Sequence, residues 1–354
     1  MMNEFIFSMI TNDLFYKKDN KGNDVNSIYL ETKDYKTLLV LHYLYLNINR
    51  LNKCMFSIES LLNYYDIKIN KNKGKSVEQI RNILVYLQQN NIVECDIDMN
   101  KIKPKELIQC EFNPTNTIYN EENDIELSTQ FVKLPLWVVG RIMNYKETKI
   151  NNIQLLFYWC YLECRKYKYY DSTYNVRNGG RATVTYVSMK KITKDTNITD
   201  TTIKKYNDIL VKLNLLRIGN CGLCFKKSDL NNGNKIVSKK ESINIYCTVT
   251  ELTDLLENDK SSNTLDQIKR GINEYKNKML ENGYIVLEGR EYKNNNKSIS
   301  GYIGRINYLD SIGKATDKQI EQRDFYLNRL NEIEKDTDTD KSIWNINGND
   351  FIRV

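Results

Sequence analysis

Three stretches of the chain share one pattern of apolar and polar positions. Residues 76–94 (SVEQIRNILVYLQQNNIVE), 201–218 (TTIKKYNDILVKLNLLRI) and 264–286 (TLDQIKRGINEYKNKMLENGYIV) place apolar side chains at alternating steps of three and four. That spacing puts them on one face of a helix, and each stretch ends in a short β-type pair. The pattern therefore predicts a helix followed by a strand three times. The apolar positions are Val77, Ile80, Leu84 and Leu87, then Ile203, Tyr206, Leu210 and Leu213, then Leu265, Ile268, Ile272, Tyr275 and Met279.

A shorter predicted helix precedes each stretch and begins at a hydroxyl residue. Ser57, Ser188 and Thr250 open the segments SIESLLNYYDI, SMKKITKDTNI and TELTDLLEND. Serine or threonine at that place accepts a hydrogen bond from a free amide of the first turn. Ahead of the first two copies, the segments 34–50 and 153–167 are apolar nearly all round, which predicts central buried helices. Short helix, turn, longer helix and strand is the order of a helix-turn-helix with a wing.

Further strands are predicted after the second and third copies. LLRIGNCGLCFKK, from residue 215, turns at the glycine-containing NCG, and SINIYCTV at 242–249 returns. The segment 284–309 reads as a hairpin with a long basic tip. We interpret both as wings, and the alternative is that the copies reflect only the general habits of amphipathic helices. The hydrophilic run NEENDIE at 120–126 is interpreted as a linker between the first two modules.

In this order of helices and strands, residues 30–250 resemble the plasmid replication initiators that bind iterons with two winged-helix domains. They resemble more loosely the winged-helix replisome organisers of phages and low-GC bacteria. The resemblance rests on architecture and on no diagnostic motif. It implies an α+β, mainly helical fold of tandem winged helix-turn-helix domains with β-hairpin wings, and it implies binding to repeated DNA sites. The third copy and a basic insert at 163–186 depart from that family pattern.

Charge and composition add modest support. The 354 residues carry 52 Lys and Arg against 45 Asp and Glu, a net charge of +7, so a preference for polyanions depends on clustering. Eight unevenly spaced cysteines favour reduced thiols and a cytoplasmic protein. The longest apolar run, at 153–162, is half of the roughly 20 residues that a membrane-spanning helix needs, and the N-terminal segment lacks an export signal.

The second helix of a helix-turn-helix enters the major groove with its first turns, so the polar face of each longer helix supplies candidate base contacts. In the first copy the basic residues lie in the preceding turn, IKINKNKGKS, which predicts phosphate contacts there and base contacts in the second copy. For any single lysine the alternative is a solvated surface charge. The candidate DNA-binding residues are Lys71, Lys73, Lys75 and Asn82 in the first copy, Thr201, Lys204 and Lys205 in the second, and Gln267, Arg270 and Asn273 in the third.

A second basic cluster, ECRKYKYYDSTYNVRNGGRATVTY at 163–186, interleaves cations with tyrosines. Aromatic rings pack on sugars or unstacked bases while cations neutralise phosphates, so this segment is another candidate surface. The alternative, equally open, is a solvated helix end followed by a flexible hairpin that turns at Asn178-Gly179. The candidate residues here are Arg165, Lys168, Arg177 and Arg181.

The sequence predicts no catalytic or metal site. The single histidine, His42, lies in an apolar segment, and a two-histidine metal site cannot be built from it. The GKS at 74–76 lacks the glycine that a phosphate-binding loop requires five residues earlier, where Ile69 stands. Cys221 and Cys224 have zinc-knuckle spacing, but no second such pair exists, so ordinary reduced cysteines are preferred over zinc ligands. We expect no enzyme activity, no catalytic residue, no metal and no cofactor.

Four regions are predicted: a first winged-helix domain at 1–125, a second at 126–248 with the basic Tyr-rich insert, a third helix-turn-helix-like unit with a hairpin at 249–310, and a C-terminal helix with a polar tail at 311–354. The predicted helix at 316–336 either packs on the third unit or contacts a partner. The predicted function is sequence-specific binding of double-stranded DNA by a plasmid or phage replication initiator, a monomer or homodimer that recruits host replication proteins and contacts no membrane. The alternatives are a winged-helix transcription regulator and a protein-interaction scaffold, which the acidic Glu78 and Asp208 favour.

Overall fold

The computed structural model describes residues 6–18, 23–112, 118–120, 125–127, 131–147, 149–166, 170–171, 176–177, 182–226, 240–251, 263–287 and 324. The protein is α+β, with helices and small antiparallel sheets. It divides into two compact units: unit 1 is Met1–Tyr167, Val184–Leu216 and Cys247–Thr264, and unit 2 is Lys168–Thr183, Arg217–Tyr246 and Leu265–Val354. Among the described residues, no helix is both long enough and apolar enough to cross a membrane.

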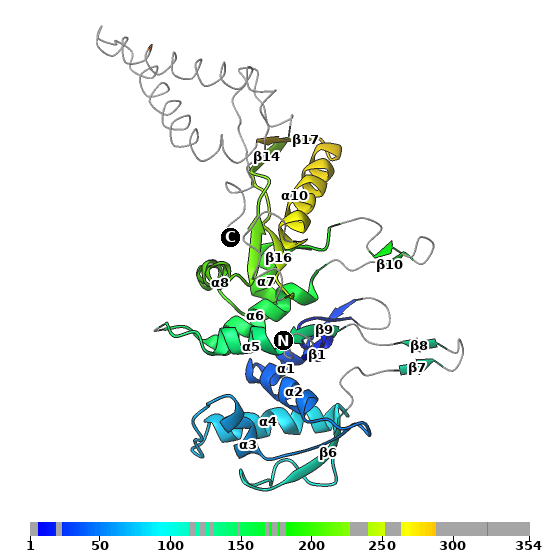
Figure 1. Ribbon diagram of the computed structural model, residues 1–354, viewed down its shortest axis with the longest axis vertical. Coiled ribbons are helices and arrows are strands. Elements are labelled where there is room, and N and C mark those ends of the chain that lie inside the picture. Colours follow the sequence, from blue (N-terminus) through cyan, green and yellow to red (C-terminus); the bar gives the residue numbers. More distant parts are fainter. Residues whose placement is uncertain are drawn as a thin grey trace. The chain divides into compact units, whose positions relative to one another are not determined.

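The first module, residues 36–112 of unit 1, contains the predicted helices and the strand after them in order, together with two strands that were not predicted. It comprises α2 (Lys36–Leu46), β4 (Lys53–Phe56), α3 (Ile58–Tyr64), α4 (Ser76–Gln89), β5 (Val93–Glu94) and β6 (Ile108–Phe112), and the two strands that were not predicted are β4 and β6. The strands form an antiparallel sheet in the order β4-β6-β5, and α4 packs on both α2 and α3 (Figure 1). The central helix predicted at 34–50 is therefore confirmed as α2, which is buried over most of its length.

Local sequence signals account for the helices of this module. Ser57 caps α3 as predicted, because its hydroxyl accepts from the N–H of Ser60 at 3.0 Å while the Ser60 hydroxyl accepts from the N–H of Ser57 at 2.9 Å. This reciprocal pair is a capping box, with serine in place of the usual Glu or Gln. The predicted apolar face of α4 is buried along its whole length, so the helix is held by burial of one stripe.

The N-terminal segment pairs with a strand far along the chain. β1 (Phe7–Thr11) is antiparallel to β9 (Phe131–Pro135), with Ile10 opposite Val132. Between β1 and α2 lie η1 (Asn12–Leu14), the paired β2 (Lys17–Lys18) and β3 (Asp24–Val25), and α1 (Ile28–Thr32). The segment interpreted as a linker, 120–126, overlaps two paired strands, since β7 (Ile118–Asn120) is antiparallel to β8 (Ile125–Leu127).

The second module comprises residues 152–166, 184–216 and 247–249 of unit 1 and follows α5 (Leu136–Met143). Its elements are α6 (Asn152–Cys164), β12 (Thr185–Tyr186), α7 (Met189–Thr196) and α8 (Asp200–Lys212). Within unit 1 it also holds the first residue of β13 (Leu216–Gly219) and the last two of β16 (Ile245–Thr248), strands of a sheet ordered β12-β16-β13. The helices predicted at 153–167, from Ser188 and from 201 are thus confirmed.

Hydrogen bonds of buried side chains tie α6 to the rest of the second module. The Trp159 indole N–H donates to the carbonyl of Leu215 at 3.0 Å, and the Tyr158 hydroxyl donates to Asn207 Oδ1 at 2.7 Å. All four groups lie in the interior, where an unpaired polar atom is costly. The large aromatic side chains of α6 can therefore be fully buried without leaving their polar atoms unsatisfied.

Unit 2 contains β10 (Tyr170–Asp171), β11 (Val176–Arg177), β14 (Leu223–Lys226), β15 (Lys240–Glu241), β17 (Tyr284–Leu287) and most of α10 (Asn263–Glu281), as well as the remainders of β13 and β16. α10 packs closely on β13, since a Cβ added to Gly219 would lie 2.5 Å from Ile272 Cδ1. The third predicted helix and the strand after it are confirmed as α10 and β17. The helix predicted at 250–259, the hairpin beyond residue 287 and the helix at 316–336 lie outside the described residues, apart from Asp324.

The predicted turn at NCG is corrected. β14 pairs with β15 and β17 in a sheet ordered β15-β14-β17, so residues 220–222 interrupt an extended chain and do not reverse it. The Asn220 side chain fastens this break, accepting from the N–H of Gly222 at 2.7 Å and donating to the carbonyl of Ser242 at 3.0 Å. Gly222 has a φ of 94°, a conformation that residues with a Cβ rarely adopt.

Candidate nucleic-acid interface

A loop with four exposed lysines, residues 68–75, leads into α4 and is called the lysine loop. Ser76, the first residue of α4, closes it: the hydroxyl donates to the carbonyl of Lys68 at 2.7 Å and accepts from the N–H of Asn70 at 3.0 Å. The N–H of Val77 donates to the carbonyl of Asn70 at 3.2 Å. These bonds hold the base of the loop against the start of α4. The exposed lysines are Lys68, Lys71, Lys73 and Lys75.

The tip of the lysine loop is fastened by an acidic residue. Gly74 has a φ of 71°, and its N–H donates to Glu78 Oε2 at 2.6 Å. The Glu78 carboxylate, which the scaffold alternative would present to a partner, is therefore engaged by the loop itself. Within the described part of the chain, no ion pair involves a lysine of this loop. Asn82, one turn beyond Glu78 on α4, is exposed.

The first turns of α8 carry the candidate residues of the second module. Thr201 and Lys204 are exposed, and the Thr201 hydroxyl lies 3.1 Å from the hydroxyl of Thr199, the N-cap residue. Lys205 lies 3.8 Å from Glu147, with both side chains nearly half exposed. A pair so open to water contributes little, so the Lys205 ammonium remains exchangeable with another anion.

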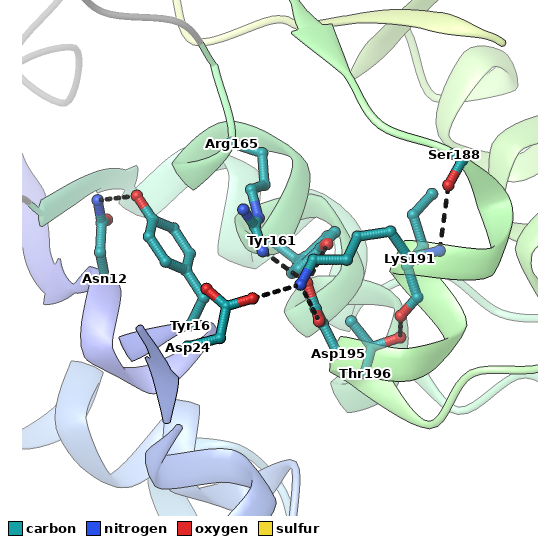
Figure 2. A network of polar contacts seen from close by, with 10 residues as sticks. Asn12, Tyr16, Asp24, Tyr161, Arg165, Ser188, Lys191, Asp195 and Thr196 are labelled. Atoms are coloured by element: carbon teal, nitrogen blue, oxygen red, sulfur yellow. Dashed lines mark hydrogen bonds and ion pairs between the residues drawn. The ribbon is translucent and has the colours of Figure 1, made fainter. Parts of the chain in front are cut away.

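Arg165 belongs to an internal network and not to an open cationic surface (Figure 2). The hub is the buried carboxylate of Asp195 on α7: Oδ2 accepts from Arg165 Nη2 at 2.6 Å and from the Tyr161 hydroxyl at 2.8 Å. The Arg165 guanidinium also lies over the ring of Tyr16, 4.2 Å from its centroid. Burial raises the pKa of Tyr161, and the neighbouring Asp195 carboxylate raises it further. The Tyr161 hydroxyl therefore stays protonated and can donate its hydrogen bond.

Lys191 extends this network toward the N-terminal segment. Its ammonium lies 3.1 Å from Asp195 Oδ1 and 3.1 Å from Asp24 Oδ2 (Figure 2). The Tyr35 hydroxyl adds a neighbouring link by donating to the carbonyl of Thr196 at 2.7 Å. α7 is therefore bonded to the segment that precedes the first module.

Little else of the basic insert is described. Arg177 lies on β11 opposite Tyr170 of β10, so the insert does contain two paired strands, but both precede Asn178-Gly179 and the predicted position of the turn is wrong. Lys168, Arg181 and the predicted turn at Asn178 lie outside the described residues.

In unit 2, α10 anchors the end of the insert. Gln267 Oε1 accepts from the N–H of Thr183 at 2.8 Å, and Glu274 Oε1 accepts from the N–H of Ala182 at 2.7 Å. Gln267, a predicted base-contacting residue, thus has its side-chain oxygen engaged within the unit. Arg270 and Asn273 are exposed on the same helix. Sequence reasoning missed Glu274, although its seven-residue spacing from Gln267 places both on one helix face.

The buried histidine is part of the core. Tyr65 donates its hydroxyl to the carbonyl of Leu39 at 3.1 Å, so His42 Nδ1, 2.5 Å from that hydroxyl, carries the proton and donates. Burial lowers the pKa of His42 to about 4. Among the described residues, no group of three or more His, Cys, Asp or Glu side chains is arranged to hold a metal ion. Cys221 and Cys224 are buried thiols outside any disulfide.

No protein-family description, curated protein or solved structure matches this chain.

Proposed function

We propose that the protein binds double-stranded DNA in a sequence-specific manner through two winged-helix modules, and that it is a plasmid or phage replication initiator. The observation that carries the proposal is the repetition of one element order. The first module runs α2, β4, α3, α4, β5, β6. The second runs α6, β12, α7, α8, β13, β16, with the strands β10 and β11 inserted before β12 and the strands β14 and β15 inserted before β16. Both sheets place the last of the three strands in the middle.

The proposal assigns different tasks to the two modules. The lysine loop presents cations on a backbone whose hydrogen bonds are internal, so its ammonium groups are the part left for an anionic partner. Such a loop suits phosphates, which attract cations without regard to sequence. α8 presents Thr201 and Lys204 on its first turns, where a hydroxyl and an ammonium can reach base edges in a major groove.

Salt-dependent binding tests this division of tasks. Gel shifts would use fragments of the replicon that encodes the protein and a scrambled duplex, each at several salt concentrations. Replacing Lys71, Lys73 and Lys75 together by Ala removes three cations, so the slope of log affinity against log salt becomes shallower by about 3 on both duplexes. The same three positions changed to Arg keep the charge and serve as the matched control, with an unchanged slope.

The task proposed for the second module is tested by measuring the preference for the cognate fragment over the scrambled duplex. Thr201→Ala and Lys204→Ala each remove a side chain that can hydrogen-bond to a base. Each is expected to lower the preference for the cognate fragment over the scrambled duplex by about 1–3 kcal/mol. Binding that is equal on every fragment and vanishes with salt contradicts sequence recognition and favours a protein-interaction scaffold. A cognate fragment at a promoter and not at an origin contradicts the initiator role and leaves DNA binding intact.

A further inference from the structure

Three cysteines of the first module lie in one row across its sheet. Cys54 on β4 is directly opposite Cys110 on β6, and their Sγ atoms are 3.2 Å apart. On the other side of β6, β5 pairs Val93 with Phe112 and Glu94 with Glu111. Continuing that register by one residue brings Cys95 opposite Cys110.

The three side chains differ in their access to solvent. Cys54 and Cys110 are 2% and 3% exposed, whereas Cys95 is partly exposed. The Cys95 thiol donates to the carbonyl of Gln109, the residue next to Cys110, at 3.2 Å. A dissolved oxidant can therefore reach Cys95 in the folded protein, while the inner pair is screened from it.

We propose that Cys54 and Cys110 form a reversible disulfide by exchange with a small-molecule disulfide, and that Cys95 is the thiol that first meets this oxidant. In the reduced state the two sulfurs are already in contact, so bond formation needs only a small approach of the two strands. The proposal is independent of DNA binding. It concerns a redox-dependent bond in a protein whose cysteines are otherwise reduced.

The exchange balances in three steps. The Cys95 thiolate attacks glutathione disulfide, forming a mixed disulfide and releasing one glutathione thiol. The Cys110 thiolate then attacks the Cys95 sulfur, the second glutathione leaves as a thiol, and the proton lost by Cys110 goes to it. Finally the Cys54 thiolate attacks the Cys110 sulfur, and Cys95 returns to a thiol. Two thiols of the protein are oxidised and one glutathione disulfide is reduced to two thiols.

In the reduced protein, the pKa values of the two buried thiols are shifted in opposite directions. A hydrogen bond from the Cys110 thiol lowers the pKa of Cys54 below its usual value, although burial opposes this. The same pairing, with burial, raises the pKa of Cys110. The first proton to leave the reduced pair is therefore the one on Cys54, and Cys110 gives up its proton only as it attacks the Cys95 sulfur.

Peptide mapping of the full-length native protein tests the proposal. The protein is equilibrated in glutathione buffers from fully reduced to fully oxidised, quenched with acid, alkylated and digested with trypsin. Cleavage after Lys and Arg places Cys54, Cys95 and Cys110 in separate peptides, 54–68, 82–101 and 106–133. We expect peptides 54–68 and 106–133 to become linked, with loss of two hydrogen atoms, while Cys160 stays alkylated. Dithiothreitol should reverse the link.

Variants test the Cys54–Cys110 disulfide separately from the role of Cys95 in forming it. Cys54→Ala and Cys110→Ala each abolish the link, and Cys95→Ala reaches the same final extent about tenfold more slowly, because the oxidant must then reach a buried thiol. Absence of the link in native wild-type protein, or a final link between Cys95 and Cys110, overturns the proposal. Equal rates for wild type and Cys95→Ala overturn the route through Cys95.

Discussion

Acid is expected to destabilise this protein through a single imidazole, because His42 is the only histidine in the chain. Its ring is buried in α2, with Nδ1 donating to Tyr65 and with Nε2 lacking a hydrogen-bond partner. A second proton would place a charge on that ring without any counter-charge. Burial therefore lowers the pKa of His42 from 6.5 to about 4 in the folded protein.

The sign and size of the effect follow from proton linkage. As the pH falls below 6.5 the unfolded chain takes up a proton at His42 and the folded chain does not, so unfolding is favoured. Stability from this group is complete above pH 6.5 and is lost between pH 6.5 and about 4. One pKa unit corresponds to about 1.4 kcal/mol, which gives a loss of about 2 kcal/mol at pH 5 and about 3 kcal/mol once the folded ring also titrates.

Urea unfolding followed by circular dichroism at pH 7 and pH 5 measures this loss. The matched variant is His42→Leu, which keeps an apolar side chain in the core and leaves the bond from Tyr65 to Leu39 in place. Carboxylates titrate equally in both proteins, so the difference between the two pH dependences isolates the imidazole. We expect wild type to lose about 2 kcal/mol more than the variant. Identical pH dependences in the two proteins would refute the reasoning.

Three further results are expected. Asp195→Asn leaves two cations beside an uncharged amide and should lower the free energy of unfolding by about 3 kcal/mol. Lys205→Ala breaks an exposed ion pair and should lower it by less than about 1 kcal/mol. Equal losses of the two variants in urea unfolding would contradict the burial argument. Replacing Gln267 and Glu274 together by Ala removes the hydrogen bonds to the backbone at 182–183, so trypsin should cut the basic insert faster. An unchanged cutting rate would show that α10 does not anchor the insert. Ser76→Ala removes both bonds at the base of the lysine loop and should speed amide hydrogen exchange at 68–77, with about 1–3 kcal/mol lost locally, while Ser76→Thr keeps the hydroxyl and the protection.

The elements that could be predicted are those encoded locally. α4 and α8 follow from apolar residues at steps of three and four, and α3 and α7 follow from the hydroxyl residues Ser57 and Ser188 at their starts. These signals act within one or two helical turns, so a short stretch of sequence is enough to recognise them.

The features that the sequence did not predict depend on residues far apart in the chain. The β1–β9 pair joins residues more than a hundred positions apart, and one of the two partners of β14 is β17, which follows α10 in the sequence. The sequence predicts a cationic surface at Arg165 because its neighbours along the chain are cations, yet Asp195 and Tyr16 lie next to it in space. A run of charges does not show which of them the fold neutralises.

The pairing of β1 with β9 also has a consequence for synthesis on the ribosome. The chain emerges from its N-terminus, so β1 is made first, but its partner, Phe131–Pro135, is made only after the whole first module. The first module contains its own sheet and central helix, so it can fold before β1 has a partner to pair with. β1 then pairs late, when the chain leading into α5 emerges. A nascent chain stalled after residue 112 has emerged but before residue 131 emerges would carry a folded module behind an unpaired N-terminal strand.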